Sequence, residues 1–415
     1  MKGMRSFELE KENSYYTWFS KTEVEEEQKD LIYLDNAATT FPKPDCVYQV
    51  MDQVNRSLAV NAGRGSYRLA QIAVEGMDSL RMELLDMIGA KKQAEVVFTT
   101  SATMAFNQII GGRMLSDGDR VYVSPFVHNA VMRTLWMHQQ KCGYVIRKLP
   151  VNVDNMEIDL EKLEYMFREQ PPTYVFLSHV SNVTGYILPV KEIFELAKKV
   201  SHGQAVVVLD AAQSFGLVPI NYEEMPFDAI AFAGHKTLYG PLGIAGFIKK
   251  KTLKLEPYLA GGTGSDSLKL DMPQEGAGRY EPGSPNITAI AGLYASVRYI
   301  KEQGLEKIFA HEQNLTRLLV EGLKKIDGVK VYTLKDVTKQ VGIVSFNIEG
   351  YQAEEVAMLL AEDYHIAVRA GYHCAPLVHE HLKDKGYAGT VRVSMGWFND
   401  EEDVEKLLTA VCEIS

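Results

Sequence analysis

The sequence predicts an α/β protein whose large domain has a mainly parallel sheet covered by helices, with a smaller α+β domain after it. Short apolar runs rich in β-branched residues alternate with helical patterns from about residue 46 to residue 285, as expected of strands joined through crossover helices. After residue 285 the pattern changes to two helices followed by separate strands. A chain of 415 residues is also too long for one small core.

Strands of the large sheet are predicted where short apolar runs lie between polar segments. They are Glu95–Phe98, Arg120–Val123, Tyr144–Leu149, Thr173–Ser178, Ala205–Asp210, Ala229–Ala233 and Ile244–Lys249. Amphipathic helices are predicted between several of them. The segment Lys191–Ser201 is an example, because its apolar residues share one helical face: Ile193, Phe194, Ala197 and Val200.

The second domain is predicted to contain two helices, near Ile287–Lys307 and Glu312–Lys325, and strands near Lys330–Tyr332, Gly342–Ile348 and Thr390–Ser394. We assign residues 46–285 to the large domain, and residues 31–45 with 286–415 to the small one. Residues 1–30 are polar and acidic, and we interpret them as a solvated extension. Its aromatic residues are expected to dock on the body of the protein: Tyr15, Tyr16, Trp18 and Phe19.

The composition argues against several classes of protein. The formal net charge is −10 and no basic stripe is interleaved with aromatic residues, so nucleic acid is not an expected partner. No stretch resembles a signal peptide or reaches the roughly 18 apolar residues of a membrane span, so no membrane partner is expected. The four cysteines lie far apart and form no CxxC pair, which suits a protein of the reducing cytoplasm.

A carboxylate and a lysine follow two successive apolar strands. Asp210 ends the run 206–210, and Lys236 lies among glycines 26 residues later, just after the run 229–233. In an open α/β sheet, ligands bind beyond the carboxyl ends of the strands, where a lysine can be desolvated and act as an amine nucleophile. Pyridoxal phosphate needs such a pair: a lysine for its aldehyde and a carboxylate for its ring nitrogen. An isolated strand-end aspartate, however, is usually a cap or turn residue.

A phosphate site is predicted at the segment Thr99–Thr103. It follows an apolar strand and precedes a helical pattern, so its hydroxyl groups and the backbone amides near Ala102 open a helix N-terminus. The signal is weak by itself because Ser and Thr cap most helices.

These motifs together resemble the class V aminotransferases of the cysteine desulfurase group, which have the PLP type I fold. The similarity extends from Tyr33 to the C-terminus. Its motifs are Tyr33–Thr40, His179–Gly185, Gly234–Lys236, Gly283–Asn286 and Arg369–Pro376.

The resemblance implies a role for each matching residue. Lys236 binds the cofactor and moves the proton at the substrate Cα, Asp210 pairs with the ring nitrogen, and His128 stacks on the ring and exchanges protons with the substrate. Asn182 and Gln213 contact the ring hydroxyl. The phosphate ligands implied are Ala102, Thr103, His235 and, from the second subunit of a homodimer, Ser284. Capping, turn or core roles remain open for His128, Asn182 and Gln213.

Two positions depart from the pattern of related chains. Ala233 stands where many relatives have a serine before the Gly-His-Lys motif, so we expect Ser101 or Thr100 to supply the missing phosphate hydroxyl. The segment Asn61–Gly65 lacks the histidine that a common subgroup has before its arginine, which affects substrate preference rather than the cofactor.

The substrate is expected to contact Asn36, Asn182 and Arg392. Arg392 lies on a predicted strand, where a buried charge needs a partner. The α-carboxylate of the substrate is one possible partner, and an internal salt bridge is the other.

Cys374 distinguishes between the reactions open to this family. It lies in a loop between Gly371 and Pro376, where a thiol can be exposed and mobile. The resemblance implies a persulfide on Cys374, formed from L-cysteine with release of L-alanine and passed to a protein acceptor of unknown identity. His373, Cys374, His379 and His381 could be taken for a metal site, but the proline and flexible stretch between them make a poor tetrahedral frame, and no metal is expected.

Other functions remain open from the sequence. A selenocysteine lyase or a cysteine sulfinate desulfinase would use the same residues, and an aminotransferase would leave Cys374 idle. A non-catalytic scaffold is disfavoured because Lys236, Asp210 and Cys374 are all present.

Overall fold

The computed structural model describes residues 20–62, 65–152, 155–264 and 268–415. A sheet of seven strands forms its centre, in the order β2-β8-β7-β6-β5-β3-β4. The strands are β2 (Ala94–Thr99), β3 (Arg120–Val123), β4 (Val145–Lys148), β5 (Tyr174–Ser178), β6 (Val206–Asp210), β7 (Ala229–Ala233) and β8 (Ala245–Lys250). Strand β8 runs opposite to the other six strands, which confirms the mainly parallel sheet.

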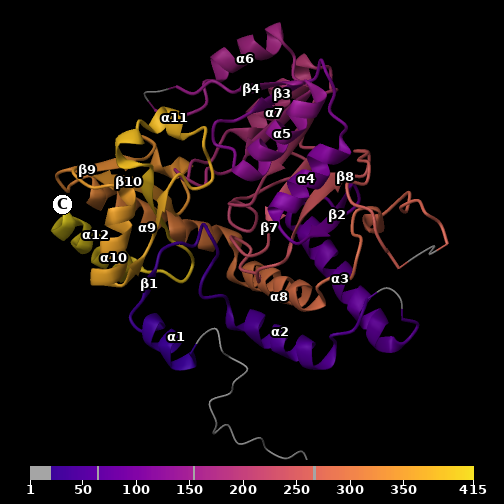
Figure 1. Cartoon of the computed structure of the whole chain (residues 1–415), viewed down its shortest axis with the longest axis horizontal. Helices are drawn as coiled ribbons and strands as arrows, with labels where there is room; N and C mark the ends of the chain where they lie inside the picture. The colour runs from indigo at the N-terminus through magenta and orange to yellow at the C-terminus, as the bar shows by residue number, and fades with distance from the viewer. Residues whose placement is uncertain (1–19, 63–64, 153–154, 265–267) are drawn as a thin grey trace, which may run out of the picture.

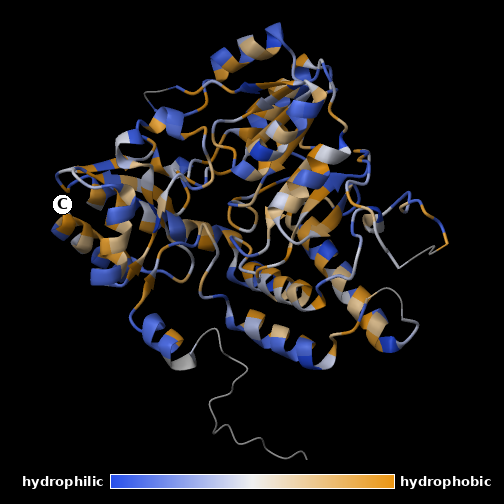
Figure 2. Cartoon of the chain, in the orientation of Figure 1, coloured by the Kyte–Doolittle hydropathy of each residue, from blue (hydrophilic) through white to orange (hydrophobic). Residues whose placement is uncertain are grey.

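Helices cover this sheet in the part of the molecule around β3 to β8 (Figure 1). They are α3 (Arg68–Met87), α4 (Ala102–Gly112), α5 (Asn129–Cys142), α6 (Leu160–Glu169) and α7 (Val190–Val200), whereas α2 (Asp45–Ser57) packs on α8 (Ile287–Gln303). The central strands β5 and β7 are buried along their whole length, as expected of a sheet covered on both faces. Figure 2 shows apolar and polar residues alternating along the helices, so each helix has a face to bury.

A second sheet of four strands lies in the C-terminal part of the chain. Its order is β12-β13-β10-β9, all antiparallel, with β9 (Val329–Tyr332), β10 (Ile343–Ile348), β12 (Arg369–Gly371) and β13 (Thr390–Ser394). The helices nearby are α9 (Leu305–Leu323), α10 (Ala353–Tyr364), α11 (His379–Leu382) and α12 (Glu401–Ile414). Short 3₁₀ turns span Ala277–Arg279, Val337–Lys339 and Lys385–Tyr387.

The chain crosses between the two sheets near its beginning. After α1 (Lys21–Gln28), strand β1 (Ile32–Tyr33) pairs with β11 (Ile366–Ala367), and Asp35 bridges to Ser394 at the end of β13. The chain then reaches the large sheet, where the amide of Thr40 donates to the carbonyl of His235 at 3.0 Å. Residues 33–40 therefore connect the lysine loop after β7 to the second sheet.

One helix prediction was wrong in its bounds. The segment 287–307 was expected to form a single helix, but α8 (Ile287–Gln303) ends at Gly304, whose φ is +88°, and α9 starts at the next residue. Glycine adopts this φ at little cost, so the chain can turn sharply there.

The domain division stays a prediction. Helix α8 contacts α2 and α3, and its apolar residues pack with the core of the large sheet. Of the predicted extension, α1 is exposed, and the aromatic residues of the segment 15–19 lie outside the described residues.

Candidate active site

A cavity of about 250 Å³ opens at the carboxyl ends of the central strands. Ser178 ends β5, Asp210 ends β6, and Lys236 follows β7, and all three line this cavity. The first residues of α4 and α5 and the loop that holds Cys374 complete the walls. The structure therefore brings the predicted lysine, carboxylate and thiol to one site from segments far apart in the sequence.

Lys236 lies in a loop whose backbone is held by two hydrogen bonds to the Lys236 carbonyl. The hydroxyl of Thr40 donates to its carbonyl at 2.9 Å, and the amide of Tyr239 donates to the same carbonyl at 2.8 Å. The surrounding protein desolvates the ammonium group and lowers the pKa of Lys236 from 10.5 to about 8, while Asp210 opposes part of this shift. Near pH 8, a substantial fraction of the molecules therefore carries Lys236 as a neutral amine, as a Schiff-base lysine requires.

Asp210 is buried at the carboxyl end of β6. One carboxylate oxygen accepts a hydrogen bond of 3.0 Å from the amide of Ala212, within the turn after the strand. Burial raises the pKa of Asp210, whereas the Ala212 amide and the positive charge of Lys236 lower it. A buried carboxyl group in the cavity lining fits the protonated nitrogen of a pyridine ring.

His128 caps the N-terminus of α5. Its Nδ1 accepts a 3.0 Å hydrogen bond from the amide of Ala130, so the proton of the neutral ring is on Nε2. Burial and the positive charge of Lys236 lower the pKa of His128 to about 3. The cap expected as the alternative role is present, and the neutral ring nevertheless lines the cavity.

The start of α4 forms the predicted phosphate region. Ser101, Ala102 and Thr103 line the cavity, and Ser101 Oγ accepts from the amide of Met104 at 3.2 Å, which leaves its O–H as a donor. His235 also lines the cavity, and its buried Nδ1 has no hydrogen-bond partner among the described residues. A helix N-terminus beside an unpaired imidazole nitrogen fits a phosphate.

Of the two residues expected to replace the serine absent at Ala233, Ser101 lines the cavity and Thr100 does not. Ser284 also lies outside the cavity of the single chain. It is exposed, and its Oγ accepts a 3.3 Å hydrogen bond from Asn61. Arg64 of the neighbouring motif lies outside the described residues.

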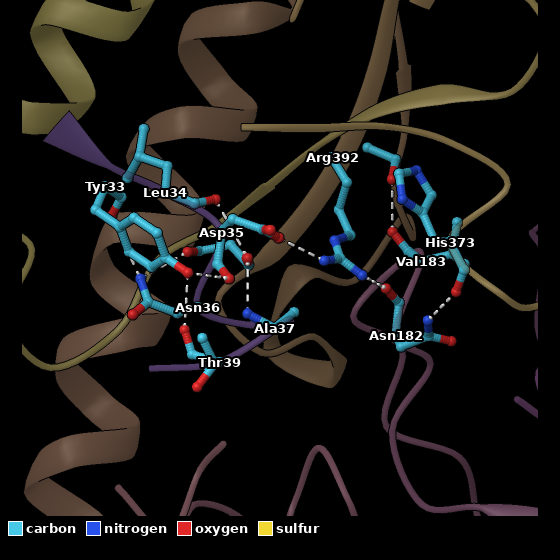
Figure 3. A network of polar contacts seen from close by, with 12 residues as sticks. Tyr33, Leu34, Asp35, Asn36, Ala37, Thr39, Asn182, Val183, His373 and Arg392 are labelled. Atoms are coloured by element: carbon cyan, nitrogen blue, oxygen red, sulfur yellow. Dashed lines mark hydrogen bonds and ion pairs between the residues drawn. The ribbon is translucent and has the colours of Figure 1, made fainter. Parts of the chain in front are cut away.

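Gln213 and Asn182 line the cavity, and the side-chain amide nitrogen of each donates a hydrogen bond to a backbone carbonyl. Gln213 donates to the carbonyl of Ala37 at 2.8 Å, and Asn182 donates to the carbonyl of His373 at 2.7 Å. Figure 3 shows the second of these bonds. Their side-chain oxygens make no hydrogen bond with the described residues, so both residues fix the site while keeping an acceptor for a ligand.

Arg392 is buried on β13 and lines the cavity. Its Nη2 lies 2.6 Å from Asp35, and its Nη1 donates to the carbonyl of Asn182 at 3.0 Å (Figure 3). The internal salt bridge considered as one alternative is therefore present. Its buried Nε has no partner among the described residues, so the guanidinium keeps donor capacity for a carboxylate.

Asn36 differs in position from what was expected of a substrate contact. It does not line the main cavity, and its amide nitrogen donates to Ser394 at 2.9 Å and to Asn399 at 3.1 Å. Its oxygen accepts from the amide of Phe41 at 3.3 Å. Both ends of this side chain are thus used to hold the segment after β1, so its observed contacts are structural.

Cys374 is exposed and lines the same cavity. The turn is tightly bonded rather than open: the carbonyl of His373 accepts from Asn182, and that of Cys374 accepts from the amide of Asn129 at 2.7 Å. The thiol is therefore exposed, as predicted, while its backbone is held by hydrogen bonds. Within the described ranges, no group of three or more His, Cys, Asp or Glu side chains could hold a metal ion.

Arg369 also lines the cavity, although the sequence analysis assigned it no role. It is exposed on β12, pairs in register with Arg392, and makes no side-chain hydrogen bond or ion pair with the described residues. Its position in the same motif as Cys374, five residues earlier, was the available signal. A guanidinium in the same cavity as the thiol adds a second positive charge for an anionic substrate.

The residues present fit pyridoxal phosphate. The cavity offers a desolvated lysine, a buried carboxyl group, a helix N-terminus with an unpaired histidine nitrogen, and a free guanidinium donor. These match the aldehyde, the ring nitrogen, the phosphate and the carboxylate of an amino-acid substrate in turn. The described helices include none long and apolar enough to cross a membrane.

Known proteins resemble this chain over nearly its full length. The sequence profile named Aminotransferase class-V matches residues 32–407. A probable cysteine desulfurase of Halalkalibacterium halodurans is 34% identical, covering 91% of each chain, and a cysteine desulfurase of Haloferax volcanii is 31% identical, covering 94% of this chain and 90% of the relative.

Solved structures give the same result. The cysteine desulfurase of Thermococcus onnurineus superposes with a TM-score of 0.84 at 34% identity, covering 93% of this chain and 95% of the other. The cysteine desulfurase CsdA of Escherichia coli gives 0.81 at 27% identity, covering 95% and 98%. With the family profile spanning most of the sequence, this chain belongs to the class V aminotransferase family, whose members use pyridoxal phosphate.

Proposed function

We propose that this protein is a pyridoxal phosphate-dependent cysteine desulfurase that converts L-cysteine to L-alanine and holds the sulfur as a persulfide on Cys374. The observation that carries this proposal is an exposed thiol in the same cavity as the desolvated Lys236 and the buried Asp210. The relatives named cysteine desulfurase support the same reaction.

Pyridoxal phosphate, when bound, supplies an electrophilic aldehyde and a ring that withdraws electrons from the Cα of an amino acid. The amine of Lys236 would hold the aldehyde and, once free, would move the Cα proton. Asp210 would keep the ring nitrogen protonated. Neutral His128 lines the cavity with its proton on Nε2, from which it would donate to the substrate or the ring. Ser101, Thr103 and His235 would hold the phosphate.

Sulfur leaves the substrate by attack of the Cys374 thiolate on the substrate Sγ. A new S–S bond forms, and the Cβ–Sγ bond breaks with its electron pair left on the carbon fragment. That fragment takes up protons and leaves as alanine. No external oxidant is needed, because the sulfur atom that is transferred and the carbon that is reduced come from the same substrate.

The rival reactions differ in their need for Cys374. A selenocysteine lyase or a cysteine sulfinate desulfinase has a leaving group that departs with less help, and an aminotransferase has no use for the thiol. The position of the thiol in the cavity wall favours the desulfurase.

The test compares Cys374→Ala with a control that changes another exposed cysteine, Cys412→Ala. Cys374→Ala is expected to bind the cofactor and cysteine but to release almost no sulfide, while Cys412→Ala keeps wild-type turnover. Wild-type enzyme treated with cysteine and then alkylated should show one extra sulfur on the peptide with Cys374. Wild-type desulfuration by Cys374→Ala, or an extra sulfur on another cysteine alone, would refute the proposal.

We also propose that the protein acts as a homodimer in which Ser284 contacts the phosphate of the second subunit. Support comes from its exposure and from the exposed apolar side chains of Leu242, Tyr258 and Leu259 on the neighbouring loops. Light scattering should give twice the chain mass, and a fully active monomer would contradict the proposal. The sulfur acceptor is proposed to be a protein, and four unpaired cysteines support a cytoplasmic location.

A further inference from the structure

The turn that presents Cys374 has an unfavourable backbone conformation. His373 and Cys374 have φ values of +45° and +55°, in the left-handed region that non-glycine residues rarely adopt. Two such residues in succession persist only where the surrounding structure fixes them. The contacts that hold this turn therefore decide where the thiol lies.

Hydrogen bonds hold three successive carbonyl groups of this turn. Those of His373 and Cys374 are bonded by Asn182 and by the amide of Asn129, both beside the cavity. The carbonyl of Tyr372 accepts from the amide of Ala375 at 3.0 Å and lies 3.1 Å from Nε2 of His379. His379 is buried on α11, outside the residues that line the cavity.

The contacts of the two ring nitrogens of His379 show where its protons lie. Nδ1 of His379 contacts Oδ2 of Asp384. The side chain of Asp384 is fully buried, and its Oδ1 has no hydrogen-bond partner within the described part of the chain. A carbonyl oxygen only accepts, so Nε2 must carry a proton to bond Tyr372. Asp384 and Nδ1 then share a second proton, because a bare nitrogen lone pair against a buried carboxylate is strongly unfavourable.

We propose that His379 and Asp384 form a positioning pair that locks the Tyr372 carbonyl and thereby sets the place of the Cys374 thiol. The pair acts at a distance, through the backbone, and touches neither cofactor nor substrate. The proposal rests on the proposed function only in naming Cys374 as the thiol that accepts sulfur. Asp384 holds the proton at Nδ1 and fixes the plane of the ring, as a carboxylate does for a histidine in catalytic triads, so that the Nε2–H points at the Tyr372 carbonyl.

Two substitutions of His379 separate its contact with Asp384 from its contact with the Tyr372 carbonyl. The amide nitrogen of Gln occupies nearly the place of Nε2, so His379→Gln keeps a donor for the Tyr372 carbonyl. The amide nitrogen of Asn occupies nearly the place of Nδ1, so His379→Asn keeps the contact with Asp384 and loses the one with Tyr372. His381→Asn is the control, since this half-buried histidine lies on the same helix and its ring makes no hydrogen bond with the described residues.

The first measurement is hydrogen exchange of the peptide that spans residues 372–378, followed by mass spectrometry of the holoenzyme. It reports the turn itself and needs no turnover. His379→Asn is expected to raise exchange in this peptide, while His379→Gln and His381→Asn stay close to wild type. Equal exchange in all four proteins would overturn the proposal. Where His379→Asn does not fold, Asp384→Ala replaces it, and unchanged exchange there would overturn the proposal equally.

The second measurement is the rate of alanine formation from cysteine. His379→Asn should lower kcat by about a hundredfold, the loss typical of a reacting group displaced by about 1 Å, with KM and the absorbance of bound cofactor unchanged. His379→Gln should recover most of kcat. A rise in exchange with wild-type kcat would refute positioning. If wild-type enzyme itself makes no alanine, the proposed function fails, and the exchange data still decide whether the pair locks the turn.

Discussion

The guanidinium of Arg392 lies 2.6 Å from the carboxylate of Asp35, a contact between residues 357 positions apart (Figure 3). It joins β13 to the segment after β1 and holds in place a guanidinium that lines the cavity and whose buried Nε has no partner among the described residues. A substrate carboxylate would thus meet a guanidinium that is already oriented. The ion pair and the binding role are compatible, because they use different nitrogens.

This relationship predicts opposite effects of two substitutions on cysteine binding. Arg392→Lys removes the fixed donor at Nε and should raise KM for cysteine about tenfold, the loss of one charged hydrogen bond. Asp35→Asn removes the charge that balances Arg392 and should lower KM while also lowering stability. Steady-state kinetics and thermal unfolding would measure both. If Arg392 serves only the ion pair, both variants will lose stability and neither will change KM.

Lys236→Ala should remove the absorbance of covalently held cofactor and all turnover, because no other amine is described among the cavity residues. The pKa of Lys236 near 8 adds a pH dependence. Since only the neutral amine reacts, the rate at which cofactor-free protein takes up pyridoxal phosphate should rise with pH and level off above about 8. Stopped-flow absorbance would measure the rate of cofactor uptake at each pH. A rate that keeps rising to pH 10 would mean that the amine has an ordinary pKa.

Asp210→Asn should still bind the cofactor but lose several orders of magnitude in kcat, since a neutral pyridine ring withdraws electrons poorly. A suitable control is Asp228→Asn, which changes another buried carboxylate, one that precedes β7 and is bonded to Lys198. The control should lose stability while keeping its cofactor chemistry. Comparable kcat in the two variants would count against the role of Asp210.

Glu312 should make the protein less stable as the pH rises. Its carboxyl group is buried between α9 and the segment near Gly342, and desolvation raises its pKa from 4.5 to about 8. The folded state therefore holds a proton that the unfolded state releases above pH 4.5. The stability due to this proton is complete below pH 4.5 and is lost as the pH rises through about 8.

Glu312→Gln, a neutral side chain of the same shape, should remove this dependence. Relative to wild type, the variant should gain about 1 to 4 kcal/mol in unfolding free energy between pH 5 and pH 9. Urea unfolding at both pH values would measure the gain, with Glu306→Gln, exposed on the same helix, as the control. Parallel pH curves for wild type and Glu312→Gln would show that the carboxyl group is not held neutral.

The sequence by itself determined the strands of the large sheet and the place of the site, but not the short strands β1, β11 and β12. The runs 120–123, 229–233 and 390–394 match β3, β7 and β13 residue for residue. Strand periodicity is local, and the carboxyl ends of parallel strands must meet at one edge, so Asp210 and Lys236 could be placed together without a structure. The end of α8 at Gly304 was missed because helical patterns on both sides of the glycine continue in phase.

Only the tertiary structure decided which polar atoms have partners. The bond between Asp35 and Arg392, the structural use of Asn36, and the pair of His379 with Asp384 depend on the packing of two sheets and the loops between them. A sequence pattern shows that a side chain is polar but not which of its atoms is already bonded, because a hydrogen bond needs its donor and acceptor about 3 Å apart in space. That spacing is set by the packed chain, and it separates the residues left free to bind a ligand from those that hold them in place.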